Sequence, residues 1–249
     1  MKPLSWLVQN QYTILLMILT GIAALVVGIK NYRRHRELRI FTFYVLFSLT
    51  QDASDFFRCM CPKGAIAPMI IEGCITLGFM LFEFGVWTFF ILSHITSAKR
   101  RMIVKIIPIV FVVLTICFIW RKSGEVNFLL LNCTLLALPC FFYFYELFLS
   151  VHEKPLKDQP SFWVITGMLF FSCCSIPLYL IMNAFGKSAN ETFSLNYLLY
   201  SLFFSLLIRA YCCKPATKAS IARTQQAKGL QKNKKIEHLI SQKEYEYAN

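Results

Sequence analysis

The chain has 249 residues, of which 57% are hydrophobic, 16% are aromatic and only 16% are charged. A soluble domain of this length carries about a quarter charged residues, and here the charges sit in clusters between long apolar runs. This pattern indicates a membrane protein and excludes one large soluble core. Most of the net charge of +13 flanks the apolar runs, which favours anionic lipid over nucleic acid as a partner.

Seven apolar runs follow one another along the chain. The first begins at Tyr12, and the basic loop 30–39 comes after it, the reverse of the charge order in a signal peptide, so we expect a retained helix. Each run has about 18 to 26 residues, enough to cross ~30 Å of hydrocarbon at ~1.5 Å per residue. The predicted spans are residues 12–29, 40–57, 68–93, 102–120, 127–150, 162–185 and 193–212.

The distribution of Lys and Arg predicts the orientation of these spans. The connections after the first, third, fifth and seventh spans, together with the C-terminal segment, carry 20 of the 26 basic residues. The richer side faces the cytoplasm by the positive-inside rule. An N-terminus outside and a C-terminus inside follow, and this alternation requires an odd number of spans.

The predicted fold is therefore an all-α, seven-helix transmembrane bundle over residues 1–213. Within a bilayer the backbone must satisfy its own hydrogen bonds, and helices joined by short connections do so. Residues 214–249 form a polar, basic tail, which we expect to be cytoplasmic and disordered or partly helical. The tail is a candidate contact for a protein partner.

Ionisable residues within the spans are the first candidates for function, because burying them in lipid is costly. Glu83 lies near the middle of the third span, and Glu72 lies eleven residues earlier. Eleven residues correspond to about three helical turns, so Glu72, Thr76 and Glu83 share one helix face. This face predicts either a ligand, cation or proton site in the bundle interior, or a structural hydrogen bond to a neighbouring helix.

A second polar group lies near the outer end of the second span. Asp52, Asp55 and Arg58 are spaced three residues apart and form either a local ion-pair network or a ligand-facing vestibule. Asn132 of the fifth span is a candidate for a hydrogen bond across helices. Whether Asp52 meets Glu83 is left open by the sequence.

Motifs of catalysis and cofactor binding are not found, so no catalytic residue, metal site or cofactor is assigned. The sequence has no HExxH, GxSxG, Walker or dinucleotide-binding motif, and its cysteines do not form paired CxxC motifs. Glu146 is near the inner end of its span and is expected to reach the interface; His94 is assigned no role. The predicted cytoplasmic basic surface consists of Arg33, Arg34, Arg36, Lys99, Arg100 and Arg101.

The order of several short motifs resembles uncharacterised seven-helix bacterial membrane proteins, which are similar in plan to the membrane input modules of sensor kinases. These motifs are the basic loop after the first span, LFEFGVWTFF in the third, FFYFYELF ending the fifth and PSFWVITGMLFF entering the sixth. The resemblance covers about residues 10–212 and implies the bacterial inner membrane. The chain has no kinase motif.

These features favour a non-enzymatic membrane module, either receptor-like or an accessory subunit, that contacts a partner through its cytoplasmic loops and tail. A small transporter or channel that uses the same carboxylates is the alternative. A membrane-embedded lipid-modifying enzyme ranks below both, because no pair of nucleophile and base is evident in the sequence.

Overall fold

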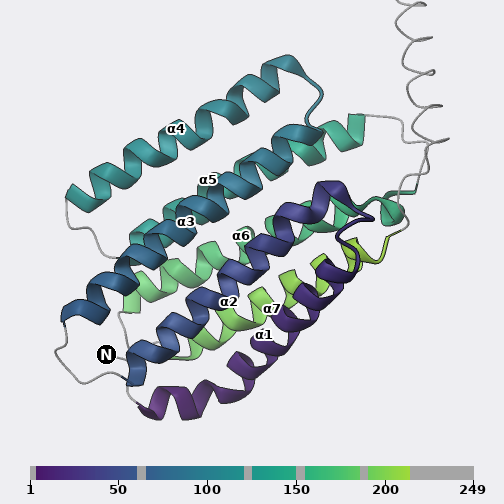
Figure 1. Ribbon diagram of the computed structural model, residues 1–249. Helices are drawn as coiled ribbons and strands as arrows, with labels where there is room; N and C mark the ends of the chain where they lie inside the picture. Colours follow the sequence, from purple (N-terminus) through teal and green to yellow (C-terminus); the bar gives the residue numbers. More distant parts are fainter. Residues whose placement is uncertain (1–3, 61–65, 121–124, 150–154, 186–189, 214–249) are drawn as a thin grey trace, which may run out of the picture. The chain divides into compact units, whose positions relative to one another are not determined.

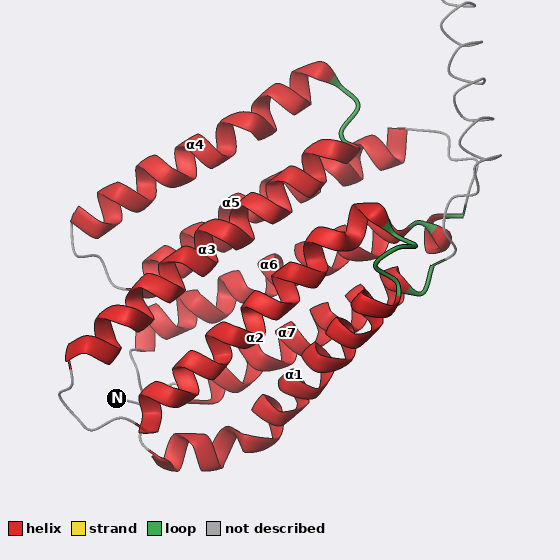
Figure 2. Ribbon diagram, viewed as in Figure 1, coloured by secondary structure: helices red, strands yellow, loops and turns green. Residues whose placement is uncertain are grey.

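The computed structural model describes the chain from residue 4 to residue 213 with four short gaps, and near the gaps it describes only the backbone of some helix ends. The described ranges are 4–60, 66–120, 125–149, 155–185 and 190–213. Within these ranges the regular structure is helical and contains no strand (Figure 2). The prediction of an all-helical chain is therefore confirmed for the described residues.

Seven long helices form the bundle, and each coincides with one of the apolar runs. Two single 3-10 turns, Arg36–Leu38 and Leu156–Asp158, lie in the connections. The helices are α1 (Leu4–Lys30), α2 (Arg39–Met60), α3 (Ile66–His94), α4 (Ala98–Trp120), α5 (Glu125–Leu149), α6 (Pro160–Phe185) and α7 (Asn190–Tyr211).

Four of the helices contain a described stretch long and apolar enough to cross a membrane. These stretches are Tyr12–Lys30, Leu77–His94, Leu129–Leu149 and Pro160–Ala184, in α1, α3, α5 and α6. A helix of about 20 apolar residues matches the thickness of the hydrocarbon core. The described helices are thus consistent with the membrane protein that the composition predicts.

The helices pack as a closed ring with one member outside it. Neighbouring pairs run α1–α2, α2–α3, α3–α5, α5–α6, α6–α7 and α7–α1. Helix α4 packs on α3 and α5 at the edge of the bundle (Figure 1). Since α4 returns the chain from the end of α3 to the start of α5, the adjacent helices α3 and α5 run parallel to each other.

The described connections gather at one end of the bundle (Figure 2). His35, in the connection after α1, hydrogen-bonds the backbone of Cys213 beyond α7. Glu146 at the end of α5 accepts a hydrogen bond from the backbone of Ser97, between α3 and α4. These contacts bring the basic connections together, as an alternating up-and-down path of seven helices requires.

Aromatic rings fill the middle of the ring of helices. Trp87 of α3 is fully buried and packs against Tyr44 of α2, Phe171 of α6 and Phe203 of α7, with ring centroids 5.3 to 6.2 Å apart. Edge-to-face and tilted contacts of this kind add to the energy of burial. Four helices therefore meet at one side chain.

Large apolar side chains also cover the outside of the bundle. Helix α4 exposes Met102 (66%), Ile109 (64%) and Ile116 (56%), and α5 exposes Phe148 (83%). Every one of the seven helices presents at least two such exposed residues. A surface this apolar exceeds what soluble monomers expose and fits a lipid environment.

Glycines allow α1 to approach its neighbours closely. A Cβ atom added to Gly28 would lie 2.9 Å from Thr42 Oγ1 and 3.1 Å from the Tyr211 hydroxyl. Those two hydroxyl groups are hydrogen-bonded at 2.9 Å, so moving either one to make room for a Cβ atom would weaken this hydrogen bond. Small residues permit this kind of close packing between membrane helices.

We therefore expect Gly28→Ala to destabilise the bundle by about 1–3 kcal/mol, the usual cost of overpacking. The measurement is the thermal unfolding midpoint in detergent, followed by tryptophan fluorescence. Gly85→Ala is the matched control, since a Cβ atom at Gly85 meets nothing within 4 Å. Equal effects of the two substitutions would contradict the close approach of α1, α2 and α7.

Candidate functional site

Glu83 occupies the interior of the bundle and is only 2% exposed. Its carboxyl group points toward α2 and α5. The Tyr44 hydroxyl donates a hydrogen bond of 2.7 Å to Glu83 Oε1, and Asn132 Nδ2 donates one of 3.4 Å to Oε2. Three helices that are separate in sequence therefore meet at one carboxyl group surrounded by aromatic rings.

Further polar atoms near Glu83 are buried without hydrogen-bond partners among the described residues. The carbonyl Oδ1 of Asn132 and the indole Nε1 of Trp87 are two of them, and Thr88 Oγ1 on α3 is a third. Either orientation of the Asn132 amide gives Glu83 one contact and leaves the other amide atom unsatisfied. A proton on Glu83 would allow it to donate to Oδ1, so the site accommodates both protonation states of the carboxyl group.

The structure brings together two of the predicted site residues, Glu83 and Asn132. The side chains of Glu72, Thr76, Asp52, Asp55 and Arg58 lie outside the described residues. Tyr44 was missed by sequence reasoning, because it sits in the aromatic run FTFYVLF, where nothing distinguishes it from a lipid-facing ring.

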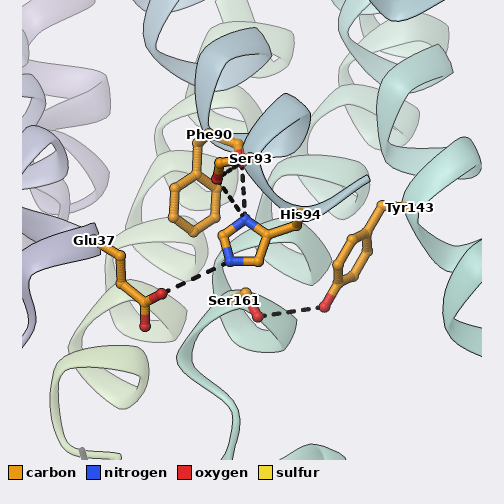
Figure 3. A network of polar contacts seen from close by, with 6 residues as sticks. All are labelled: Glu37, Phe90, Ser93, His94, Tyr143 and Ser161. Atoms are coloured by element: carbon orange, nitrogen blue, oxygen red, sulfur yellow. Dashed lines mark hydrogen bonds and ion pairs between the residues drawn. The ribbon is translucent and has the colours of Figure 1, made fainter. Parts of the chain in front are cut away.

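A second polar network occupies the end where the connections gather (Figure 3). His94, in the last turn of α3, places Nδ1 2.9 Å from the carbonyl oxygen of Phe90 and Nε2 3.8 Å from Glu37 Oε2. The interaction with His94 lowers the pKa of Glu37, which keeps this carboxyl group ionised. On the far side of His94, Tyr143 donates a weak hydrogen bond of 3.5 Å to Ser161.

Glu146 lies near the end of α5, where the described connections gather, and its carboxylate contacts the connection between α3 and α4. Its carboxylate accepts hydrogen bonds from Thr96 N (2.7 Å), Thr96 Oγ1 (2.8 Å) and Ser97 N (3.0 Å), and it pairs with Arg100 Nη1 at 3.1 Å. Ser97 directly precedes α4, so these amides are free donors of a helix start. Glu146 of α5 thus caps α4 from another helix.

The predicted basic surface is divided between exposed and engaged side chains. Arg33, Arg34, Arg36, Lys99 and Arg101 are exposed. Arg100 is half-buried. Besides its ion pair with Glu146, its guanidinium lies over the Tyr145 ring, 4.7 Å from the ring centroid. His94 and Glu146 each make several polar contacts at this end of the described bundle, and no sequence pattern predicted their partners.

His35 ties the connection after α1 to the end of α7. It is 4% exposed, and its Nε2 lies 3.0 Å from the carbonyl oxygen of Cys213. Burial lowers the pKa of His35 below the usual 6.5, despite the opposing effect of that hydrogen bond. A proton on His35 therefore favours the unfolded chain, and stability is lost as the pH falls through the range where the unfolded histidine titrates.

We expect the thermal midpoint of the wild-type chain to fall by a few degrees between pH 7.5 and pH 5.5. Acidification also begins to remove the contribution of Glu37, whose lowered pKa acts in the same direction at lower pH. His35→Gln keeps a hydrogen-bond donor for Cys213 and should flatten this dependence. A midpoint that stays level or rises on acidification in the wild-type chain would refute the role given to His35.

The described residues contain no cluster of three or more His, Cys, Asp or Glu side chains suited to a metal ion. The arrangement defines a class: an all-helical protein with several membrane-spanning candidates, a closed polar centre and a polar network at one end. Comparison with protein-family models, curated proteins and solved structures found no match to this chain.

Proposed function

We propose that the chain is a seven-span membrane protein with its N-terminus outside and its C-terminus in the cytoplasm. The exposed apolar residues on all seven helices support the number of spans. The contacts among residues 30–39, 94–98 and 209–213 support one shared face for the basic connections. By the positive-inside rule that face is cytoplasmic, and for a bacterial chain the membrane is the inner one.

We further propose that the bundle is a receptor-like or accessory module and not a transporter. The observation that carries this proposal is the closure around Glu83, whose side chain is 2% exposed and held from α2 and α5. A carboxyl group that carries ions or protons needs access to water from at least one side. Because Glu83 joins three helices, a structural change at either end of the bundle alters how these helices sit relative to one another. A protein partner would detect that change by binding the cytoplasmic connections and tail.

Reporters fused to the two ends of the full chain test the topology. We expect alkaline phosphatase at the N-terminus to be active, because it folds outside the cytoplasm, and green fluorescent protein at the C-terminus to be fluorescent. The reverse pattern, or two reporters on the same side, would overturn the orientation or the odd number of spans.

A flux measurement separates the module from the transporter. The purified chain is reconstituted into liposomes with an imposed pH gradient or sodium gradient, and we expect no flux above that of protein-free liposomes. Flux that disappears in Glu83→Gln would replace this proposal with a transport function. An unchanged, flux-free Glu83→Gln protein agrees with a structural or sensory centre.

A further inference from the structure

A groove of about 430 Å³ opens on the outside of the bundle between the start of α2 and the end of α3. Arg36 and Arg39 line it at the end of the bundle where the connections gather, which is its rim, and Phe43 and Phe89 line it about one helical turn further from that end. Phe43 is 55% exposed and Phe89 is 66% exposed, so both rings present open faces to whatever surrounds the protein. The groove therefore has a cationic end and an aromatic end.

The order of these groups along the helices matches the order of groups in a phospholipid. Arg39 precedes Phe43 by four residues on α2, and Ser93 follows Phe89 by four residues on α3. Because the two helices run in opposite directions, both rings lie about 6 Å deeper in the bundle than the arginine rim. That step corresponds to the distance between a lipid phosphate and the beginning of its acyl chains.

The charges at the rim favour an anionic headgroup. Arg36 is exposed, and Arg39 is held in place by a 2.8 Å hydrogen bond from its Nε to the Tyr32 carbonyl oxygen and by stacking on the Tyr32 ring. Glu37 is the one acidic residue lining the groove, and its carboxylate faces His94 at 3.8 Å. Arg33 and Arg34 of the same connection add positive charge nearby.

We propose that this groove binds an anionic phospholipid of the inner leaflet, with the phosphate at Arg36 and Arg39 and one acyl chain along Phe43 and Phe89. The inference rests on the proposed orientation, which puts residues 30–39 at the cytoplasmic face. Basic residues at this face attract anionic lipid, and planar guanidinium groups bind phosphate through paired hydrogen bonds.

The test uses native mass spectrometry of the full chain in detergent with added phosphatidylglycerol, phosphatidylethanolamine or phosphatidylcholine. We expect a single retained phosphatidylglycerol and weaker adducts of the other two lipids. Arg36→Gln removes a direct guanidinium contact with the phosphate in the groove and should weaken phosphatidylglycerol binding about fivefold. Arg34→Gln removes the same charge from the same connection outside the groove and should leave binding within about twofold.

A second variant tests the groove by shape. Ser93→Trp puts a large ring into the space between the helices at an exposed position, and it should abolish the retained lipid while leaving the thermal midpoint near that of the wild-type chain. Excess inorganic phosphate should not displace the lipid, because phosphate has no acyl chain to contact Phe43 and Phe89.

Three results would overturn the proposal: equal losses in Arg36→Gln and Arg34→Gln, equal binding of the three lipids, or full binding in Ser93→Trp. Lipid binding in detergent does not depend on which leaflet the groove faces. A failed lipid test therefore leaves the topology standing, whereas a reversed topology assigns the same groove to the outer leaflet.

Discussion

Glu83→Ala should lower the free energy of unfolding by about 2–4 kcal/mol, the sum of a cavity and two lost hydrogen bonds. The truncation leaves a cavity at a position that is 2% exposed. It also removes the acceptor of the 2.7 Å hydrogen bond from Tyr44 and of the 3.4 Å hydrogen bond from Asn132. Thermal unfolding in detergent, followed by tryptophan fluorescence, measures the loss.

Glu83→Gln provides the decisive comparison. Its amide carbonyl still accepts from Tyr44, and its amide N–H can donate to Asn132 Oδ1 once the Asn132 amide turns over, because Nδ2 now faces this position. We therefore expect a change below about 1 kcal/mol if the site needs a hydrogen-bonded polar group and not a charge. A Glu83→Gln protein as unstable as Glu83→Ala would show instead that the negative charge itself is required.

Thr88→Val is the control for burial on the same helix. Thr88 is also 2% exposed, but its hydroxyl has no hydrogen-bond partner among the described residues. Replacing an unsatisfied hydroxyl with a methyl group of similar volume should be neutral or slightly stabilising. A loss comparable to that of Glu83→Ala would mean that any change in this part of α3 is harmful, and the special role of Glu83 would lapse.

Glu146→Ala should destabilise the bundle by about 2 kcal/mol, in the upper range for loss of a helix cap. The substitution frees the amides of Thr96 and Ser97 at the start of α4 and leaves Arg100 without its carboxylate at 3.1 Å. Since the damage is local to the first turn of α4, hydrogen exchange of residues 98–104 should speed up more than exchange in α6.

Glu146→Gln separates the cap from the ion pair. The amide oxygen still accepts a backbone hydrogen bond, so about half of the loss should be recovered. Arg100→Met removes the ion pair and the contact with the Tyr145 ring but keeps the cap, and it should cost less than about 1 kcal/mol, as partly exposed pairs do. Exchange rates in α4 that stay unchanged in Glu146→Ala would remove Glu146 from its role as a cap.

The sequence predicts the helices well because apolar runs and basic connections are local properties, which do not depend on how distant parts of the chain pack. It also identifies Glu83, since a carboxyl group amid Phe and Leu stands out whatever surrounds it. The hydrogen-bond partners of Glu83 could not be predicted as fully. Asn132 was a candidate because it is polar, but Tyr44 is one aromatic residue among many, and only the packing of α2 against α3 selects it.

The same limit applies at the end where the connections gather. Glu146, Thr96 and Ser97 are unremarkable in the sequence, and their contact depends on α3 and α5 lying side by side. The spacing of residues on one helix predicts a shared face, but it carries no information on which other helix meets that face.

The parallel arrangement of α3 and α5 sets an order for biosynthesis. The ribosome delivers α3 before α4, and α5 reaches its place beside α3 only after α4 has returned the chain to the opposite end. Until then the carboxyl group of Glu83 has Tyr44 as its hydrogen-bond donor, without the amide of Asn132. A nascent chain halted within α4 therefore lacks one of the two hydrogen-bond donors to Glu83, and the arrival of α5 supplies it.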